Sequence, residues 1–207
     1  MERLTTAGEP RSGLRGGVIT FEISPHFTRD QFTAPLSLED RVLIFADRVR
    51  GWQLDVAERL GADPHAGFAV LAIVGSYFEL IAKYSEGYVR ADASKHHFKL
   101  GARLVLEPQS TMPGELPDSI LDLLYDEVRC GMYHGGMTGP RIRLQGGSEV
   151  QLLTIDGDHV TIDPAQLVRA LQDHFSRYVK QLSDPNNQLL RDNFRSRFDA
   201  GVRGKFN

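Results

Sequence analysis

The residues of this chain best suited to chemistry are Arg129 and His134, which stand five positions apart in the segment YDEVRCGMYHGG. A guanidinium is a permanent planar cation whose donors match phosphate oxygens, and an imidazole takes up and releases protons near neutral pH. Together they form a minimal set for cleaving a phosphodiester. On an ideal helix, however, they are about 140° apart around the axis and about 7.5 Å apart along it. They share a pocket only if the helix end is distorted, as Gly131 and the Gly135-Gly136 pair would allow, or if two chains meet there.

Helices are expected to position this pair, because apolar residues recur at steps of three and four over most of the chain. The first apolar face runs from Leu38 through Trp52 to Leu60 and ends at Gly61. Asp63 and Pro64 predict the cap and first turn of a second helix, which is apolar from 68 to 81 and therefore central. A weaker helix is expected over 94–107. The helix that carries the motif has an apolar stripe of Ile120, Leu124, Val128 and Met132.

After His134 the pattern changes to turns and strands. Residues 141–145 and 150–155 look extended, and Asp156-Gly157 is a strong hairpin signal before 159–163. Pro164 then opens a last helix, which stops at Pro185. We therefore expect a mainly α protein, an up-and-down helical bundle over 37–184 that includes an antiparallel β-hairpin over 141–163.

Two flanking segments differ from this bundle in composition. Residues 1–36 are rich in Gly, Thr, Pro and Arg, and we expect an arm with one short edge strand over 18–23. Residues 185–207 carry a surplus of positive charge, and we expect a basic tail. Such a tail is either a contact for nucleic acid or simply a solvated end, and the candidate contacts are Arg191, Arg195 and Arg197.

Composition limits the possible functions and locations. The 207 residues carry a net charge of -3, so any nucleic-acid contact must come from a local cluster or from two subunits together. The single cysteine, Cys130, excludes an intrachain disulfide and a multi-cysteine zinc site. Asp92, His96 and His97 lack a third ligand at suitable spacing, so we expect no metal and no cofactor. The N-terminus lacks a signal-peptide core and no apolar run approaches membrane-spanning length, which predicts a soluble, cytoplasmic protein.

The arrangement R-x4-H after an apolar amphipathic helix, with glycine following, resembles the signature of the HEPN superfamily (higher eukaryotes and prokaryotes nucleotide-binding domains). The resemblance covers about a dozen residues. It implies a homodimer whose motif helices are apposed, so that Arg129 and His134 of both chains line one cleft. The pattern differs at Cys130, since many ribonuclease members have Asn or Asp after the arginine.

The activity that this resemblance implies is metal-independent RNA cleavage in a toxin-antitoxin or defence system, with an antitoxin or regulatory protein as a further partner. The ribose 2'-OH would attack the adjacent phosphorus, with His134 as general base or acid and Arg129 stabilising the developing charge. The alternative function is a non-catalytic helical dimer that binds RNA, a nucleotide or a partner protein.

Four neighbouring residues are supporting candidates. Glu79 could orient Arg129 or His134 across the bundle, or lie on an exposed stripe paired with Lys83. Asp126 could form an ion pair with Arg129. In that case the motif would have a structural role: Arg129 would stabilise the negative end of the helix dipole, and His134 would cap exposed carbonyls. Cys130 and His134 form an alternative dyad, which a helix C-terminus disfavours. Tyr133 could stack on a base or fill an interface.

Overall fold

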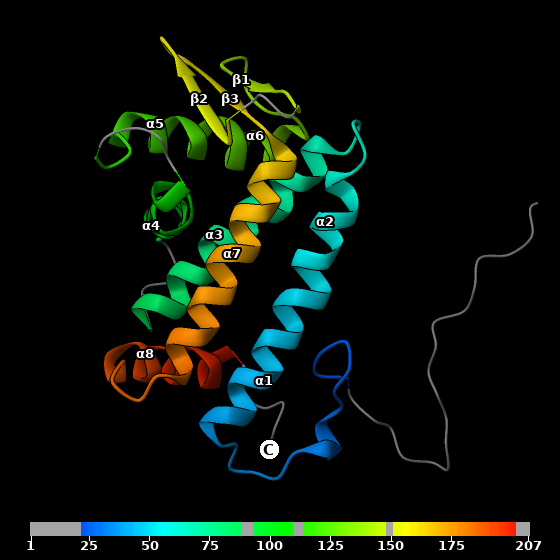
Figure 1. Cartoon of the computed structure of the whole chain (residues 1–207), viewed down its shortest axis with the longest axis vertical. Coiled ribbons are helices and arrows are strands. Elements are labelled where there is room, and N and C mark those ends of the chain that lie inside the picture. Colours follow the sequence, from blue (N-terminus) through cyan, green and yellow to red (C-terminus); the bar gives the residue numbers. More distant parts are fainter. Residues whose placement is uncertain (1–21, 88–92, 110–113, 148–150, 202–207) are drawn as a thin grey trace, which may run out of the picture.

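The computed structural model describes residues 22–87, 93–109, 114–147 and 151–201 of the chain. It shows a mainly helical protein with a small mixed sheet at one end of its long axis (Figure 1). The edge strand expected over 18–23 lies almost wholly outside these residues; within them, Glu22 forms an isolated bridge with Thr28. Beside the short 3-10 turns Arg29–Gln31 and Glu107–Gln109, the helices are α1 (Leu38–Val49), η2 (Arg50–Leu54), α2 (Asp55–Gly61), α3 (Gly67–Glu86), α4 (Ser94–Leu106), α5 (Asp118–Leu123), η4 (Leu124–Cys130), α6 (Gly131–Gly135), α7 (Pro164–Ser183) and α8 (Gln188–Gly201).

Segments α1, η2 and α2 form one long helix beside α7 (Figure 1). The helix starts at a reciprocal cap, in which the Ser37 hydroxyl accepts from the Asp40 N–H and the Asp40 carboxylate accepts from the Ser37 N–H. Its middle segment η2 is a π-helix, with more residues per turn than an α-helix. The apolar face therefore shifts register: Leu54 is buried, whereas Trp52 is 53% exposed. The prediction of one unbroken 3.6-residue face was wrong at Trp52, although Leu60 near the end of that face packs against the core.

Helix α3 is the central helix, as its all-round apolar character predicts, and it packs against α2, α4, α7 and α8. Its start differs from expectation, because Asp63 and Pro64 lie in the turn before it. There the Asp63 carboxylate accepts from the His65 N–H at 2.8 Å. Helix α4 crosses α3 very closely, since a Cβ on Gly101 would lie 2.0 Å from the Phe78 carbonyl oxygen. By length and mean hydropathy alone, α3 is the one helix within the described ranges that would also suit a membrane span, and its place inside the bundle accounts for that composition.

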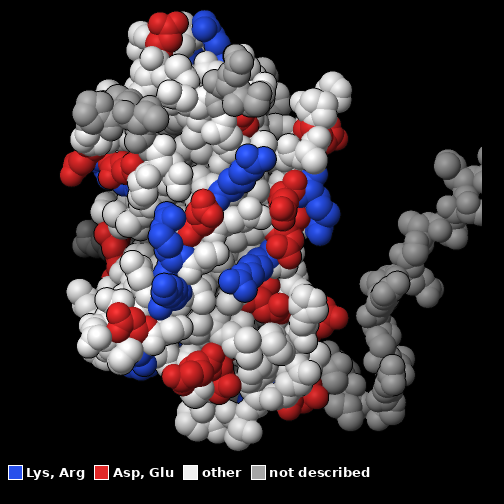
Figure 2. Space-filling view, viewed as in Figure 1, with Lys and Arg blue, Asp and Glu red and all other residues white. Residues whose placement is uncertain are grey.

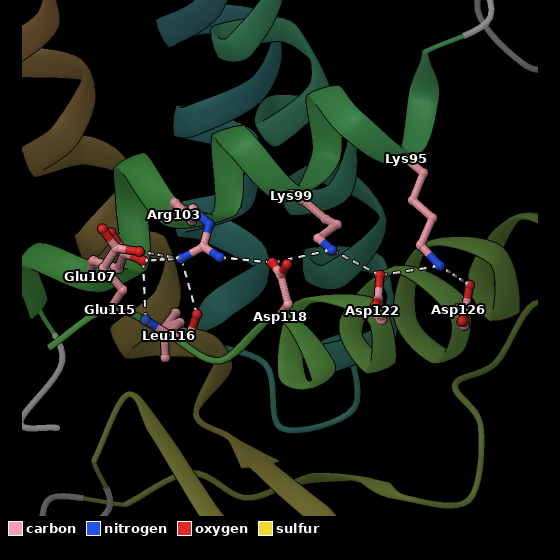
Figure 3. A network of polar contacts seen from close by, with 9 residues as sticks. All are labelled: Lys95, Lys99, Arg103, Glu107, Glu115, Leu116, Asp118, Asp122 and Asp126. Atoms are coloured by element: carbon pink, nitrogen blue, oxygen red, sulfur yellow. Dashed lines mark hydrogen bonds and ion pairs between the residues drawn. The ribbon is translucent and has the colours of Figure 1, made fainter.

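The motif-bearing helix consists of α5, the π-helical segment η4 and the short α6. It runs antiparallel to α4, because basic residues one turn apart on α4 face acidic residues one turn apart on α5 and η4 (Figure 3). Many of these side chains are well exposed, so the contacts favour this helix pairing and weaken with salt. The ion-pair ladder joins Lys95 to Asp122 and Asp126, Lys99 to Asp118 and Asp122, and Arg103 to Glu107, Glu115 and Asp118.

The sheet differs from the simple antiparallel hairpin expected over 141–163. Strands β2 (Leu153–Asp156) and β3 (His159–Ile162) pair antiparallel on either side of Gly157, whose φ of 60° requires a left-handed residue. Strand β1 (Ile142–Leu144) then pairs parallel to β3, so the sheet has the mixed order β1-β3-β2. The sequence pattern shows separate extended runs, but it does not show how the chain between β1 and β2 runs. The parallel pairing of β1 with β3 depends on that path and could not be predicted.

The segment expected to be a basic tail instead contains helix α8, which lies at the end of the molecule opposite the sheet (Figure 1). Phe194 and Phe198, four positions apart, are fully buried, and the Phe194 ring lies 5.3 Å from that of Phe45. The Asn193 side chain donates to the Ser85 carbonyl at the C-terminal end of α3. Helix α8 is therefore part of the bundle, and residues 202–207 lie outside the described ranges.

Candidate functional site

Arg129 is fixed by Glu79, which lies one helix away on α3. The Arg129 Nε donates to Glu79 Oε1 at 2.8 Å, and the guanidinium lies 4.9 Å from the ring centre of Tyr133 and 5.9 Å from that of Tyr125. The hydrogen bond to Glu79 raises the pKa of Arg129. The structure shows the expected contact of Glu79 with Arg129 and also its pairing with Lys83, whose Nζ lies 3.6 Å from Glu79 Oε2. The expected exposed stripe was wrong, because the Glu79 side chain is 14% exposed and Gly75 is buried.

The ionised form of Glu79 is favoured although the side chain is only 14% exposed. Burial opposes ionisation, but hydrogen bonds from Arg129 and Ser94 outweigh it and lower the pKa of this carboxyl. Glu79 therefore stays charged at neutral pH and holds one edge of the Arg129 guanidinium, since Nε donates to it. The other guanidinium nitrogens keep donors for a ligand.

Arg129 lines an open groove of about 670 Å³ along α3. The floor is apolar or small, with Gly75 beneath the Arg129 side chain: a Cβ there would lie 3.8 Å from Arg129 Cγ. Among the described residues, the charged groups that line the groove are the cations Lys83, Arg129 and Arg197 and the carboxylate Glu79, so positive charge is in excess. We name it the α3 groove; it is lined by Leu71, Ala72, Gly75, Ser76, Glu79, Leu80, Lys83, Tyr84, Arg129, Met132, Tyr133 and Arg197.

His134 lies beside this groove and does not line it. Its side chain is exposed, and its ring centre lies 5.0 Å from that of Tyr133, edge to face. Since the Arg129 guanidinium also lies against Tyr133, this tyrosine contacts both motif residues. Tyr133 is 75% exposed, and Met137, three positions after His134, is 60% exposed, so two large apolar side chains are uncovered near the end of the motif helix.

The segment after His134 turns back against the motif helix. Gly136 adopts a φ of 69° at the end of α6, and the Gly139 N–H donates to the Glu127 carbonyl at 2.9 Å. The Glu127 carboxylate also binds Arg141. Gly131 lies directly under this return, since a Cβ there would be 2.7 Å from the Met137 carbonyl oxygen. Gly131 thus permits the close approach of Met137 to the motif helix. The helix is distorted as expected, but at the π-helical segment η4 and not at Gly131.

The remaining supporting candidates, Asp126 and Cys130, make no hydrogen bond or ion pair with Glu79 in the described part of the chain. Asp126 pairs with Lys95 of the ladder at 3.5 Å and makes no ion pair with Arg129. Cys130 is a free, half-buried thiol. Arg129 is thus held by Glu79 from another helix and by the rings of Tyr125 and Tyr133 from its own helix.

The three arginines of α8 have different surroundings. Arg195 pairs with Asp192 at 3.0 Å, and Arg191 lines a separate hollow between α1 and α7. Only Arg197 reaches the α3 groove, where it lies near Tyr84. Burial raises the pKa of Tyr84, and the neighbouring guanidinium groups of Arg48 and Arg197 oppose that rise. The sequence pattern of this segment predicts a tail without helical structure. It therefore does not indicate which of the three arginines faces the motif.

The face of the molecule with α7 in front carries mixed charge (Figure 2). On the face in Figure 2, which has α7 in front, Lys and Arg lie among Asp and Glu, so their fields largely cancel. Among the described residues no group of three His, Cys, Asp or Glu could hold a metal ion. His96 instead binds Glu86 at 2.9 Å, His97 is buried, and Asp92 lies outside the described residues.

No family model, curated protein or solved structure matches the chain.

Proposed function

We propose that this protein is a metal-independent endoribonuclease of the HEPN type that binds RNA in the α3 groove and cleaves it with Arg129 and His134. One observation carries the proposal. Arg129 is held by Glu79 at the wall of a positively charged groove, and the exposed His134 lies one aromatic ring away. The helical bundle and the R-x4-H spacing support the same assignment.

In the proposed reaction, the ribose 2'-oxygen forms a bond to phosphorus and the bond from phosphorus to the 5'-oxygen breaks. His134 accepts the proton of the 2'-hydroxyl while water protonates the leaving 5'-oxygen, or His134 donates a proton to the 5'-oxygen while water accepts the proton of the 2'-hydroxyl. Arg129 stabilises the negative charge that grows on the non-bridging oxygens, and Glu79 keeps the guanidinium in place so that little reorganisation is needed. The products are a 2',3'-cyclic phosphate and a 5'-hydroxyl.

A homodimer is part of this proposal. The large exposed side chains of Tyr133 and Met137 beside His134 would be covered if two motif helices met. Such a contact would bring His134 of one chain toward Arg129 of the other. It would also double the positive charge near the substrate.

The experiment is incubation of pure protein with RNA in EDTA, followed by analysis of the ends of the fragments. The proposal expects cleavage with 2',3'-cyclic phosphate ends, from a species that light scattering shows to be a dimer. Absence of cleavage over a wide range of RNA substrates would contradict the activity.

A second function is favoured by a specific observation: His134 does not line the groove that holds Arg129. Under this alternative the α3 groove binds RNA or a nucleotide without cleaving it. Binding that depends on Arg129, from a protein that leaves RNA intact, would favour the alternative.

A further inference from the structure

Arg197 is a cation in the α3 groove that the R-x4-H motif does not include. It comes from α8, 68 positions after Arg129, and its side chain is half-buried. Within the described ranges, no carboxylate lies at ion-pair distance from Arg197, whereas Arg195 two positions earlier has Asp192 at 3.0 Å. The Arg197 guanidinium is therefore available to an anionic ligand in the groove.

The packing of α8 holds Arg197 where it is. Asn193, one turn before it, donates to the Ser85 carbonyl at 2.8 Å, and Asp199 binds Arg41 of α1 at 2.8 Å. Phe194 and Phe198 on either side of it are fully buried. Arg197 is therefore presented to the groove by a fixed helix.

We propose that Arg197, together with Lys83, forms a second phosphate-binding position in the α3 groove, so that the bound strand spans at least two consecutive phosphates. The first phosphate binds Arg129 and the next binds Arg197. The identity of the ligand as RNA rests on the proposed function, but the two-phosphate arrangement depends only on the groove.

The positions along α3 fit this arrangement. Arg129 meets α3 at Gly75 and Glu79, whereas Arg197 lies near Tyr84. Five residues of helix, from Glu79 to Tyr84, correspond to about 7.5 Å along the axis. That is the scale of one nucleotide in an extended single strand. Two neighbouring phosphates of one strand can therefore each meet one of the two guanidinium groups.

Tyr133 adds a position for a base at the Arg129 end. Its ring is 75% exposed and carries the Arg129 guanidinium at 4.9 Å, so a base stacked on it would lie next to the first phosphate. Stacking on an aromatic side chain requires an unpaired base. The groove therefore suits a single strand of at least two nucleotides.

The experiment measures the affinity of two cleavage-resistant ligands by calorimetry. One is a 5'-phosphorylated 2'-O-methyl dinucleotide with two phosphates, and the other is the matching mononucleotide with one. We expect Arg197→Gln to weaken binding of the dinucleotide about tenfold, the scale of one charged hydrogen bond, and to leave the mononucleotide within about twofold. Lys83→Gln should act in the same direction. Arg195→Gln, on the same helix but outside the groove, is the matched control and should change neither affinity.

Salt dependence supplies a readout that a merely structural role would not change. With a longer 2'-O-methyl oligonucleotide, the slope of log affinity against log salt should become shallower by about 0.7 in Arg197→Gln, which corresponds to one lost phosphate contact. If the wild type binds both ligands and Arg197→Gln changes neither, or weakens both equally, the second phosphate position is refuted while the proposed function stands. If the wild type binds neither ligand, the second phosphate position is refuted, and the cleavage assay in EDTA decides the proposed function separately.

Discussion

Nε of Arg129 and Oε1 of Glu79 lie 2.8 Å apart, although the two residues are fifty positions apart in the chain. The pair joins the motif-bearing helix to the central helix at the wall of the α3 groove. Glu79 thereby fixes the direction of the Arg129 guanidinium, and at the same time it places a negative charge near the proposed phosphate. These two effects on the reaction have opposite signs.

The variant Glu79→Gln separates the orienting effect of Glu79 from the effect of its negative charge. The amide oxygen can still accept a hydrogen bond from Arg129, but the charge is lost, so RNA should bind as well as before or more tightly. Because the guanidinium is held less firmly, kcat should fall about tenfold, the effect of a loss of about 1.4 kcal/mol in transition-state stabilisation. Steady-state kinetics would show this as a lower kcat with an unchanged or lower KM. A rise in KM at constant kcat would contradict the orienting role.

Gly131→Ala tests the close packing of residues 137–139 against the motif helix. The added Cβ would lie 2.7 Å from the Met137 carbonyl oxygen, so the return must shift, and we expect a loss of about 1–3 kcal/mol in the free energy of unfolding. Gly135→Ala is the matched control, since its Cβ would meet no atom within 4 Å in the part of the chain that the structure describes. Its stability should be unchanged or raised by up to about 1 kcal/mol. Equal stability of the two variants in urea denaturation would refute the close approach.

His174 should make the stability fall in mild acid. The side chain is buried and bonded to the Tyr77 hydroxyl at 2.8 Å, and burial, together with the charge of Arg177, lowers its pKa to about 4. The unfolded chain has the ordinary value of 6.5 and takes up a proton first as the pH falls, so stability is present above pH 6.5 and decreases down to about pH 4. Between pH 7 and pH 5 this amounts to about 2 kcal/mol.

His174→Gln should remove most of that pH dependence, because the amide can still form a hydrogen bond with the Tyr77 hydroxyl but does not titrate in this range. The exposed His65→Gln variant is the control and should keep the slope of the wild type. An equally steep slope in His174→Gln would show that another group titrates.

Local signals predicted much of the fold. Pro164 opens α7, Asp163 caps it by accepting from the Ala165 and Gln166 N–H groups, and β2 and β3 meet at Asp156-Gly157, all within a few residues of the signal. What local signals could not show were the π-helical segments, because a spacing of three and four assumes a uniform helix. Trp52 is exposed for this reason.

The site was predicted only in part, because its residues converge from distant segments. The spacing of Arg129 and His134 identified the motif helix, but whether Glu79 would face Arg129 or solvent depended on how α3 packs. Helix α8 was missed because its charges resemble those of a solvated tail. The available signal was Phe194 and Phe198 at a spacing of four, the apolar face that buries the helix and presents Arg197.

The central claim is that Arg129 and His134 act together on one phosphodiester, and the most direct test is the single-turnover rate of RNA cleavage in EDTA. We expect His134→Ala to lower the rate by about 10²- to 10⁴-fold and Arg129→Ala to lower it comparably, with the double variant little worse than either. His96→Ala, which removes an exposed histidine bound to Glu86, should cleave at the wild-type rate. Full activity in His134→Ala and Arg129→Ala would contradict the account.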